Sequence, residues 1–184
     1  MIFLTVGTQF PFDRLVKAVD ELVGEGLLFE EVFGQIGDAR HKPRHFAFVR
    51  CLEKEAYDEH FREASAIISH AGVGTIAMAI ELGKPLLVLP RRRDHGEVVN
   101  DHQAGLASRF DQLGHILAAE DESDLAGKVR EFETFIPKPR VAHPEAVARR
   151  IQGFLENLTG APNGRSGLCG GHEYVPADQS RTHK

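Results

Sequence analysis

Cysteine is scarce in this sequence, and neither an excess of basic charge nor a long apolar run is present. Only two cysteines occur in 184 residues, Cys51 and Cys169, and neither has a CxxC or metal-type partner. This usage fits a reducing compartment and argues against a disulfide framework. The formal net charge is -5, so no overall basic field attracts nucleic acid. We therefore expect a cytoplasmic protein that does not bind nucleic acid.

The sequence also lacks segments typical of membrane insertion or secretion. No window approaches the roughly 20 consecutive apolar residues that a transmembrane helix needs. The N-terminal stretch MIFLTVGTQF has no basic segment before its apolar run, which predicts a first strand and not a signal peptide. Any association with a membrane is therefore expected to come through a partner.

Apolar runs of strand length alternate with segments of helical periodicity along most of the chain. Strands are predicted within 2–6, 28–36, 46–52, 66–69, 85–90 and 114–119, and helices at 12–25, 55–64, 73–83, 98–110, 123–135 and 144–158. The runs AIIS and PLLVLP show no polar alternation, as expected for a parallel sheet covered on both faces. The alternation predicts an α/β fold with a doubly wound, Rossmann-like parallel sheet.

The composition changes after Leu158. The stretch 159–184 is rich in Gly, Ser, Pro and polar residues and has few apolar anchors. Low hydrophobicity of this kind is typical of disordered segments. We expect one domain over 1–158, followed by a disordered tail over 159–184.

A glycine turn, SHAGVGT, follows the predicted strand 66–69 and begins the next helix. In doubly wound sheets, ligands bind beyond the carboxyl ends of the strands, where helix N-termini present free N–H groups to anions. Gly72 and Gly74 allow a tight turn and the close approach of a ligand. His70 leaves the strand end, and Thr75 adds a hydroxyl. The turn predicts a phosphate or diphosphate site, although an isolated GxG turn is also compatible with close packing alone.

Two further loops are expected at the same edge of the sheet. The loop after the first strand offers Gly7, Thr8 and Gln9. The loop after 85–90 carries carboxylates and amides suited to the hydroxyls of a sugar, namely Asp94, Glu97, Asn100, Asp101 and Gln103. Together with a phosphate site, these groups suggest a sugar nucleotide. The same loop is equally compatible with a solvated, charged turn that caps a helix.

The ordered motifs HAGxGT, ELGKP, VLPRR and GExxNDHQ, preceded by VGTQFPFDRL, closely resemble the stand-alone C-terminal half of family 28 glycosyltransferases. The resemblance runs from Met1 to about Leu158. In this family the fold is GT-B, two Rossmann-like domains around a cleft, and the C-terminal domain binds the UDP-sugar donor without a required metal. The resemblance implies that this chain is a single C-terminal half of a GT-B fold and uses no cofactor.

The resemblance also implies roles for single residues. The donor diphosphate would be held by His70, Gly72, Gly74 and Thr75, with Thr8 and Gln9 approaching from the first loop. The hydroxyl groups of the donor would form hydrogen bonds with Asn100, Asp101 and Gln103. The uracil would lie near residues 49–52. In the reaction, His70 and the helix N-terminus would stabilise the leaving group.

One position departs from the larger relatives of the family. They place a ribose-binding acidic residue three positions after the Ser or Thr of the motif, and here that position is Met78. A thioether is a poor acceptor for hydrogen bonds from the ribose diol. Glu81 lies one helical turn further on and is a candidate replacement, with a surface or buried ion-pair role equally compatible.

The resemblance implies a second subunit. Inverting transfer needs a base, for which Asp13 and His95 are the candidates here, but enzymes of this type draw the base and the acceptor site from the other half. We expect a donor-binding, catalytic subunit that acts with a membrane-associated partner on a lipid-linked saccharide in polysaccharide synthesis. The alternatives are a non-catalytic nucleotide-sugar-binding module and a dinucleotide-binding domain. The latter is disfavoured because the first turn lacks GxGxxG.

Histidines and arginines raise two further questions. His95 and His102 do not have the spacing of a zinc-binding helix and no cysteine lies close in sequence, so no metal site is expected. The arginine run 91–93 could neutralise a donor phosphate, meet an anionic partner or acidic lipid, or be solvated. We expect it to face solvent or a partner.

Overall fold

The computed structural model describes residues 1–140 and 144–159. The chain divides into two compact units, Met1–Val141 and Ala142–Lys184. The predicted tail after Thr159, which contains Cys169, lies outside the described residues. The domain boundary at 158 stays a prediction.

Six short strands form one parallel sheet in the first unit. They are β1 (Ile2–Thr5), β2 (Val32–Gln35), β3 (Ala47–Val49), β4 (Ala66–Ser69), β5 (Leu86–Val88) and β6 (Leu117–Ala118). Their order is β3-β2-β1-β4-β5-β6, and every neighbouring pair is parallel. This is the strand order of the doubly wound fold, so the predicted fold class is confirmed.

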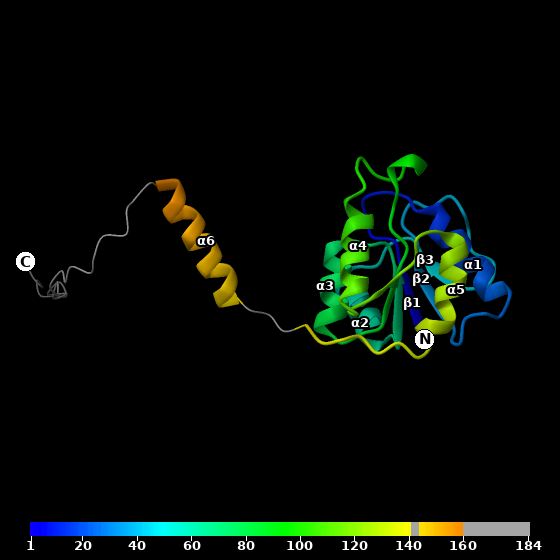
Figure 1. Cartoon of the computed structure of the whole chain (residues 1–184). Helices are drawn as coiled ribbons and strands as arrows, with labels where there is room; N and C mark the ends of the chain where they lie inside the picture. Colours follow the sequence, from blue (N-terminus) through cyan, green and yellow to red (C-terminus); the bar gives the residue numbers. More distant parts are fainter. Residues whose placement is uncertain (141–143, 160–184) are drawn as a thin grey trace, which may run out of the picture. The chain divides into compact units, whose positions relative to one another are not determined.

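Helices cover both faces of this sheet. They are α1 (Asp13–Gly24), α2 (Lys54–Glu63), α3 (Val73–Glu81), α4 (His102–Gln112) and α5 (Glu122–Phe132), with a short 3-10 helix, η1, at Arg93–His95. Figure 1 shows α2, α3 and α4 on one face and α1 and α5 on the other. The second unit contains α6 (Pro144–Thr159). In the two described ranges, no helix combines the length and apolar character needed to cross a membrane.

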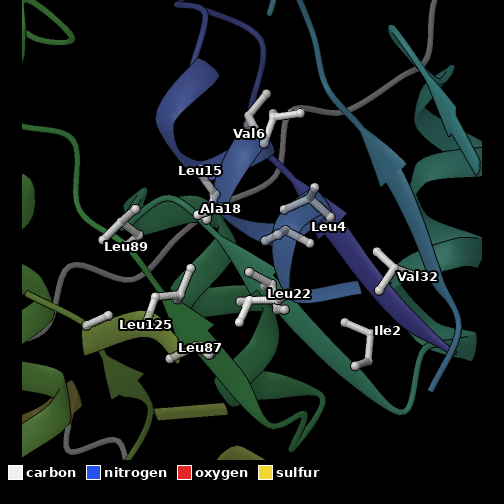
Figure 2. Close-up of a cluster of buried hydrophobic side chains, with 14 of the residues drawn as sticks. Ile2, Leu4, Val6, Leu15, Ala18, Leu22, Val32, Leu87, Leu89 and Leu125 are labelled. Atoms are coloured by element: carbon white, nitrogen blue, oxygen red, sulfur yellow. The ribbon is translucent and has the colours of Figure 1, made fainter. Parts of the chain in front are cut away.

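Consecutive residues of β1 point to opposite faces of the sheet, and both faces are buried. Ile2 and Leu4 belong to the apolar cluster beneath α1 and α5, part of which is drawn in Figure 2. Phe3 belongs to the second cluster, beneath α2, α3 and α4. In α1, one apolar face is buried, as Leu15 and Val19 illustrate. Continuous apolar strands and one-sided helices are what a covered parallel sheet requires.

The predicted helix 98–110 has wrong bounds. The chain after β5 first forms η1, then turns at Gly96, whose φ of 69° lies in the left-handed region. A residue in that conformation ends a right-handed helix. Residues 99–101 then form bends, and the α-helix begins only at His102.

Candidate functional site

The loops that follow β1, β4 and β5 meet at the carboxyl edge of the sheet. They do so because β4 lies between β1 and β5 and pairs in parallel with both. Hydrogen bonds join the loops directly. The Ser69 hydroxyl donates to the carbonyl of Thr5 at 2.5 Å, and the guanidinium of Arg91 donates to the carbonyl of Val6 at 2.7 Å. The sequence-predicted residues of the first loop, Thr8 and Gln9, are exposed on the rim.

His70 is held between two glycines at the centre of this edge. A Cβ atom added to Gly7 would lie 2.8 Å from Cε1 of His70, and one added to Gly72 would overlap Nε2. Gly7 also has a φ of 72°, which side chains rarely adopt. Both glycines therefore leave the space that the imidazole ring occupies.

The surroundings of His70 keep its ring neutral. Nδ1 lies 3.1 Å from the hydroxyl of Ser69. Burial lowers the pKa of His70 to about 4, and the nearby charge of Arg91 acts in the same direction. At pH 7 the ring is therefore uncharged in the free protein.

The N-terminus of α3 is open beside His70. Its N-cap is Gly72, no side chain caps it, and its first turn contains no acidic residue. The first N–H groups of a helix have no partner inside the helix and bind anions well. A Cβ atom at Gly74 would meet nothing within 4 Å. Gly74 thus leaves free space at the positive end of the helix.

Arg91 is buried, which contradicts the expectation that the whole arginine run faces solvent or a partner. Only 2% of its surface is exposed. Its guanidinium donates to the carbonyls of Val6 and Phe10 and lies 5.0 Å from the ring centroid of Phe12. Arg91 therefore fixes the loop after β1, whereas Arg93 is exposed as expected.

Glu97 ties the loop after β5 to α1. Its two carboxylate oxygens accept from Nε and Nη2 of Arg14 at 3.0 and 2.9 Å, and one also accepts from the backbone N–H of Arg92. The side chains of Arg14 and Glu97 are only 9% and 11% exposed. This geometry gives Glu97 a structural role, and its role toward donor hydroxyls stays a prediction.

Three of the four other polar candidates of this loop also shape its backbone, and the fourth, Asp94, is exposed. Asp101 accepts from the N–H of Arg93 at 2.9 Å, and Gln103 accepts from the N–H of Arg91 at 3.2 Å. The side-chain oxygen of Asn100 accepts from His102 at 3.4 Å. Asn100 and Asp101 remain exposed, and the amide NH2 groups of Asn100 and Gln103 can still donate.

Glu81 does not join the other candidates. His70 precedes the N-terminus of α3, whereas Glu81 is the last residue of that helix. At about 1.5 Å per residue, the two ends of the helix lie about 12 Å apart. Glu81 instead lines a hollow of about 650 Å³ with Lys138 and Arg140. Met78 packs against the apolar cluster beneath α2, α3 and α4.

Both base candidates line one hollow of about 350 Å³, next to Phe10, Arg14 and Glu97. One oxygen of Asp13 accepts from the N–H groups of Arg40 and His41 at 2.7 and 2.6 Å. Asp13 thus anchors the chain after β2. His95 is exposed.

Three positioning residues were missed in the sequence. They are Ser69, Arg14 and Tyr57, whose hydroxyl interacts with the side chains of Thr5 and Thr75. Ser69 stands within the SHAGVGT turn, but the contacts of these residues with Thr5, Glu97 and Thr75 are distant in the chain and are not marked by local sequence. In the part of the chain that the structure describes, no group of three His, Cys, Asp or Glu residues could hold a metal ion. The uracil position near residues 49–52 stays a prediction.

One family model matches most of this chain, and several known proteins are similar to part of it. A model described as "Glycosyltransferase family 28 C-terminal domain" matches residues 1–156. The UDP-N-acetylglucosamine transferase subunit ALG13 of Homo sapiens is 32% identical over 124 residues, which is 62% of this chain and 10% of that protein. The subunit of the same name from Eremothecium gossypii is 35% identical over 92 residues, 48% of this chain and 43% of the relative. The chain spans less than half the length of these relatives.

Comparison with solved structures supports the fold. An NMR solution structure of ALG13 has a TM-score of 0.54 at 21% identity, covering 81% of this chain and 93% of that one. Os79 from O. sativa in complex with UDP has a TM-score of 0.55 at 16% identity, covering 72% of this chain and 32% of Os79. The predicted single Rossmann-like half of a GT-B glycosyltransferase is confirmed.

Proposed function

The chain belongs to the glycosyltransferase family 28 C-terminal domain family, and we propose that it is the donor-binding, catalytic subunit of a two-subunit, inverting UDP-sugar transferase. The observation that carries the proposal is the open N-terminus of α3 beside His70, with free space at Gly74. An uncapped helix end offers N–H groups and positive potential to a diphosphate. UDP-N-acetylglucosamine is the first donor to test, because the relatives are named for that substrate.

The donor would lie along the carboxyl edge. The diphosphate would contact the first turn of α3 and Thr75, and the sugar hydroxyls would face the amides of Asn100 and Gln103. His70 would bind the leaving diphosphate, whose negative charge grows as the glycosidic bond breaks. Of the two base candidates, Asp13 supports a base from outside this chain, because one of its oxygens already accepts from the N–H groups of Arg40 and His41.

A partner subunit would cover this edge. Three large apolar side chains are exposed on the segments around the site, namely Phe10 at 48%, Val73 at the start of α3 at 67%, and Val99 at 83%. Exposed apolar groups around a binding site are typical of protein contacts. We propose that the partner is membrane-associated, supplies the acceptor half, and brings the subunit from the cytoplasm to a lipid-linked saccharide in polysaccharide synthesis.

The test has two stages. The purified chain is titrated with UDP-N-acetylglucosamine, UDP-glucose and UDP-glucuronate, and binding of at least one donor is expected. The chain is then combined with its partner, and transfer to a lipid-linked acceptor is measured for the wild type and for His70→Ala and Ser65→Ala. We expect His70→Ala to abolish transfer and Ser65→Ala, which lies at the opposite edge, to retain it. Full transfer by the chain without a partner would contradict the two-subunit proposal.

A non-catalytic nucleotide-sugar-binding module is the second candidate. It is favoured by Met78, which packs into the core where larger relatives carry a ribose-binding acid. If this alternative holds, the reconstituted pair assembles and binds the donor, but His70→Ala leaves the transfer rate unchanged.

A further inference from the structure

The hydrogen bonds around His70 determine which ring nitrogen carries the proton. The hydroxyl of Ser69 lies 2.5 Å from the carbonyl oxygen of Thr5. A carbonyl oxygen can only accept, so Ser69 donates its single hydrogen to Thr5. The contact of 3.1 Å between Ser69 and Nδ1 of His70 then needs Nδ1 as the donor. The neutral ring therefore carries its hydrogen on Nδ1 and a lone pair on Nε2.

Nε2 faces the loops that form the proposed donor site. A Cβ atom on Gly7 would lie 3.1 Å from Nε2, and one on Gly72, at the start of α3, would overlap it. Nδ1 points the opposite way, toward the ends of β1 and β4. A phosphate oxygen is an acceptor, as is the lone pair of Nε2. The neutral tautomer of the free protein therefore cannot donate a hydrogen bond to a donor phosphate.

The charged and titratable groups around the ring keep it in this state. Arg91, from the loop after β5, is fixed by the carbonyls of Val6 and Phe10 and cannot turn away without leaving them unpaired. Tyr57, from α2, stays uncharged because burial raises its pKa. The first turn of α3 has no acidic residue, and Glu97 is bound to Arg14. Burial and then Arg91 hold the pKa of His70 at about 4.

We propose that binding of a sugar diphosphate is coupled to the uptake of one proton at Nε2 of His70, and that Ser69 is the positioning residue that imposes this coupling. The proposal rests on the donor site proposed above. The proton comes from solvent, Nδ1 keeps its own hydrogen, and the imidazolium then donates from Nε2 to a phosphate oxygen. The negative charge of the diphosphate offsets the effects of burial and of Arg91 on the ring.

The coupling predicts how donor affinity depends on pH. The free protein binds the extra proton only below about pH 4. Between that value and the higher pKa of the complex, each unit of decrease in pH should strengthen binding by up to about tenfold, because one proton is taken up. A donor diphosphate does not itself titrate in this range, whereas the terminal phosphate of free UDP does. UDP-N-acetylglucosamine is therefore the ligand for the test.

The test is calorimetric titration of the full chain with UDP-N-acetylglucosamine at pH 5.5, between the pKa of the free ring and the ordinary histidine value of 6.5, in buffers that differ in ionisation enthalpy. The slope of the binding enthalpy against buffer ionisation enthalpy gives the number of protons taken up, and a value of about one is expected. Binding with a flat slope overturns the proton coupling but leaves the donor site intact. If no donor binds, the proposed donor site itself is wrong.

Variants separate the role of Ser69 from a purely structural one. In Ser69→Ala, Nδ1 loses the hydroxyl and keeps only the backbone of Thr5 as its partner. The tautomer with its hydrogen on Nε2, which binds phosphate without an added proton, then becomes populated, so the slope should fall below the wild-type value. His70→Gln places an amide N–H near the position of Nε2, and should bind with a slope near zero. Ser65→Ala is the matched control, because Ser65 donates to the carbonyl of Met1 at 2.8 Å at the other end of the same pair of strands. Its slope should equal that of the wild type.

Long-range 15N NMR spectra of the histidine rings provide a second measurement that does not depend on the Ser69 variant. In the free wild type, the His70 signals should show a protonated Nδ1 and a bare Nε2. With donor bound, both nitrogens should be protonated. A hydrogen on Nε2 in the free protein, or weaker donor binding of Ser69→Ala with an unchanged slope, overturns the role of Ser69.

Discussion

The turn after β4 and the loop after β5 form the same edge of the sheet but are held in different ways. The turn is fixed by close packing, since the ring of His70 fills the space beside Gly7 and Gly72. The loop is fixed by charged groups, since Arg91 binds backbone carbonyls and Glu97 binds Arg14. Packing tolerates no added atom, whereas a charged network depends on each of its partners. The two segments should therefore respond to different kinds of change.

The largest effect is expected in the loop after β5. Arg91→Met keeps an unbranched apolar stem but removes the guanidinium and its hydrogen bonds to the carbonyls of Val6 and Phe10. Leaving such acceptors unpaired should cost about 3 kcal/mol of unfolding free energy. Urea unfolding followed by circular dichroism measures the loss. The control Arg93→Met changes an exposed side chain and should stay within about 0.5 kcal/mol of the wild type. Equal losses would mean that burial of Arg91 is not what fixes this loop.

The pH dependence of stability tests the turn. Burial and the charge of Arg91 lower the pKa of His70 from 6.5 to about 4 on folding. Because the unfolded chain protonates first, this contribution to stability is complete above pH 6.5 and is lost as the pH falls toward 4. The loss should reach about 2 kcal/mol for this partly exposed ring.

The measurement is the unfolding free energy of the wild type minus that of His70→Gln, at several pH values between 7 and 4. Taking this difference removes the contributions of the other histidines. A constant difference across the series would show that the ring is not held neutral by its surroundings.

An added methyl group tests close packing at the turn directly. Gly72→Ala places a carbon atom against the ring of His70 and should cost about 1.5 kcal/mol through overpacking. Gly74→Ala, two residues further on, meets open space and should leave stability unchanged or raise it by about 0.5 kcal/mol. In calorimetry, however, Gly74→Ala should bind the donor more weakly, because its methyl group enters the space proposed for the diphosphate. Similar losses of stability in both variants would contradict the packing explanation.

The smallest effect is expected from a single carboxylate. Glu97→Gln weakens a mostly buried ion pair with Arg14 and should cost about 1 kcal/mol. Glu21→Gln changes an exposed ion pair with Lys17 and should cost about 0.3 kcal/mol or less. Added salt should screen the second pair more than the first. If both variants lose the same free energy, the loop after β5 does not depend on charge in the way described.

The sequence predicts the layout of the fold because each prediction rests on local apolar patterns. The strand AIIS at 66–69 was predicted with its observed bounds, and continuous apolar residues correctly indicated a sheet covered on both faces. Bounds failed in the loop after β5, where η1, the turn at Gly96 and the bends at 99–101 precede α4. The meeting of three loops at one edge followed from the topology, and not from any single motif.

Side-chain roles were harder to predict because they depend on partners distant in the chain. The three residues of the arginine run look alike in sequence, but Arg91 alone continues the buried path of β5 and reaches Val6, 85 residues earlier. Glu81 was a candidate from the family pattern alone, and it lies at the C-terminal end of α3, away from His70. The sequence predicted that the glycine turn binds a phosphate ligand. In the structure, Gly7 and Gly72 also leave the space that the ring of His70 occupies.

The hydrogen bonds that assemble this edge span long stretches of chain, and this has a consequence for the order of folding. Ser69 and Thr5 are 64 residues apart, and Arg14 and Glu122 are 108 apart. Closing such long loops costs entropy before the contacts form, so they are expected late on the folding route. A chain emerging from the ribosome could pair β1 with β2 early, but it could not complete the surroundings of His70 until Arg91 had been synthesised. The chain would therefore bind a donor only after the central strands of the sheet have paired.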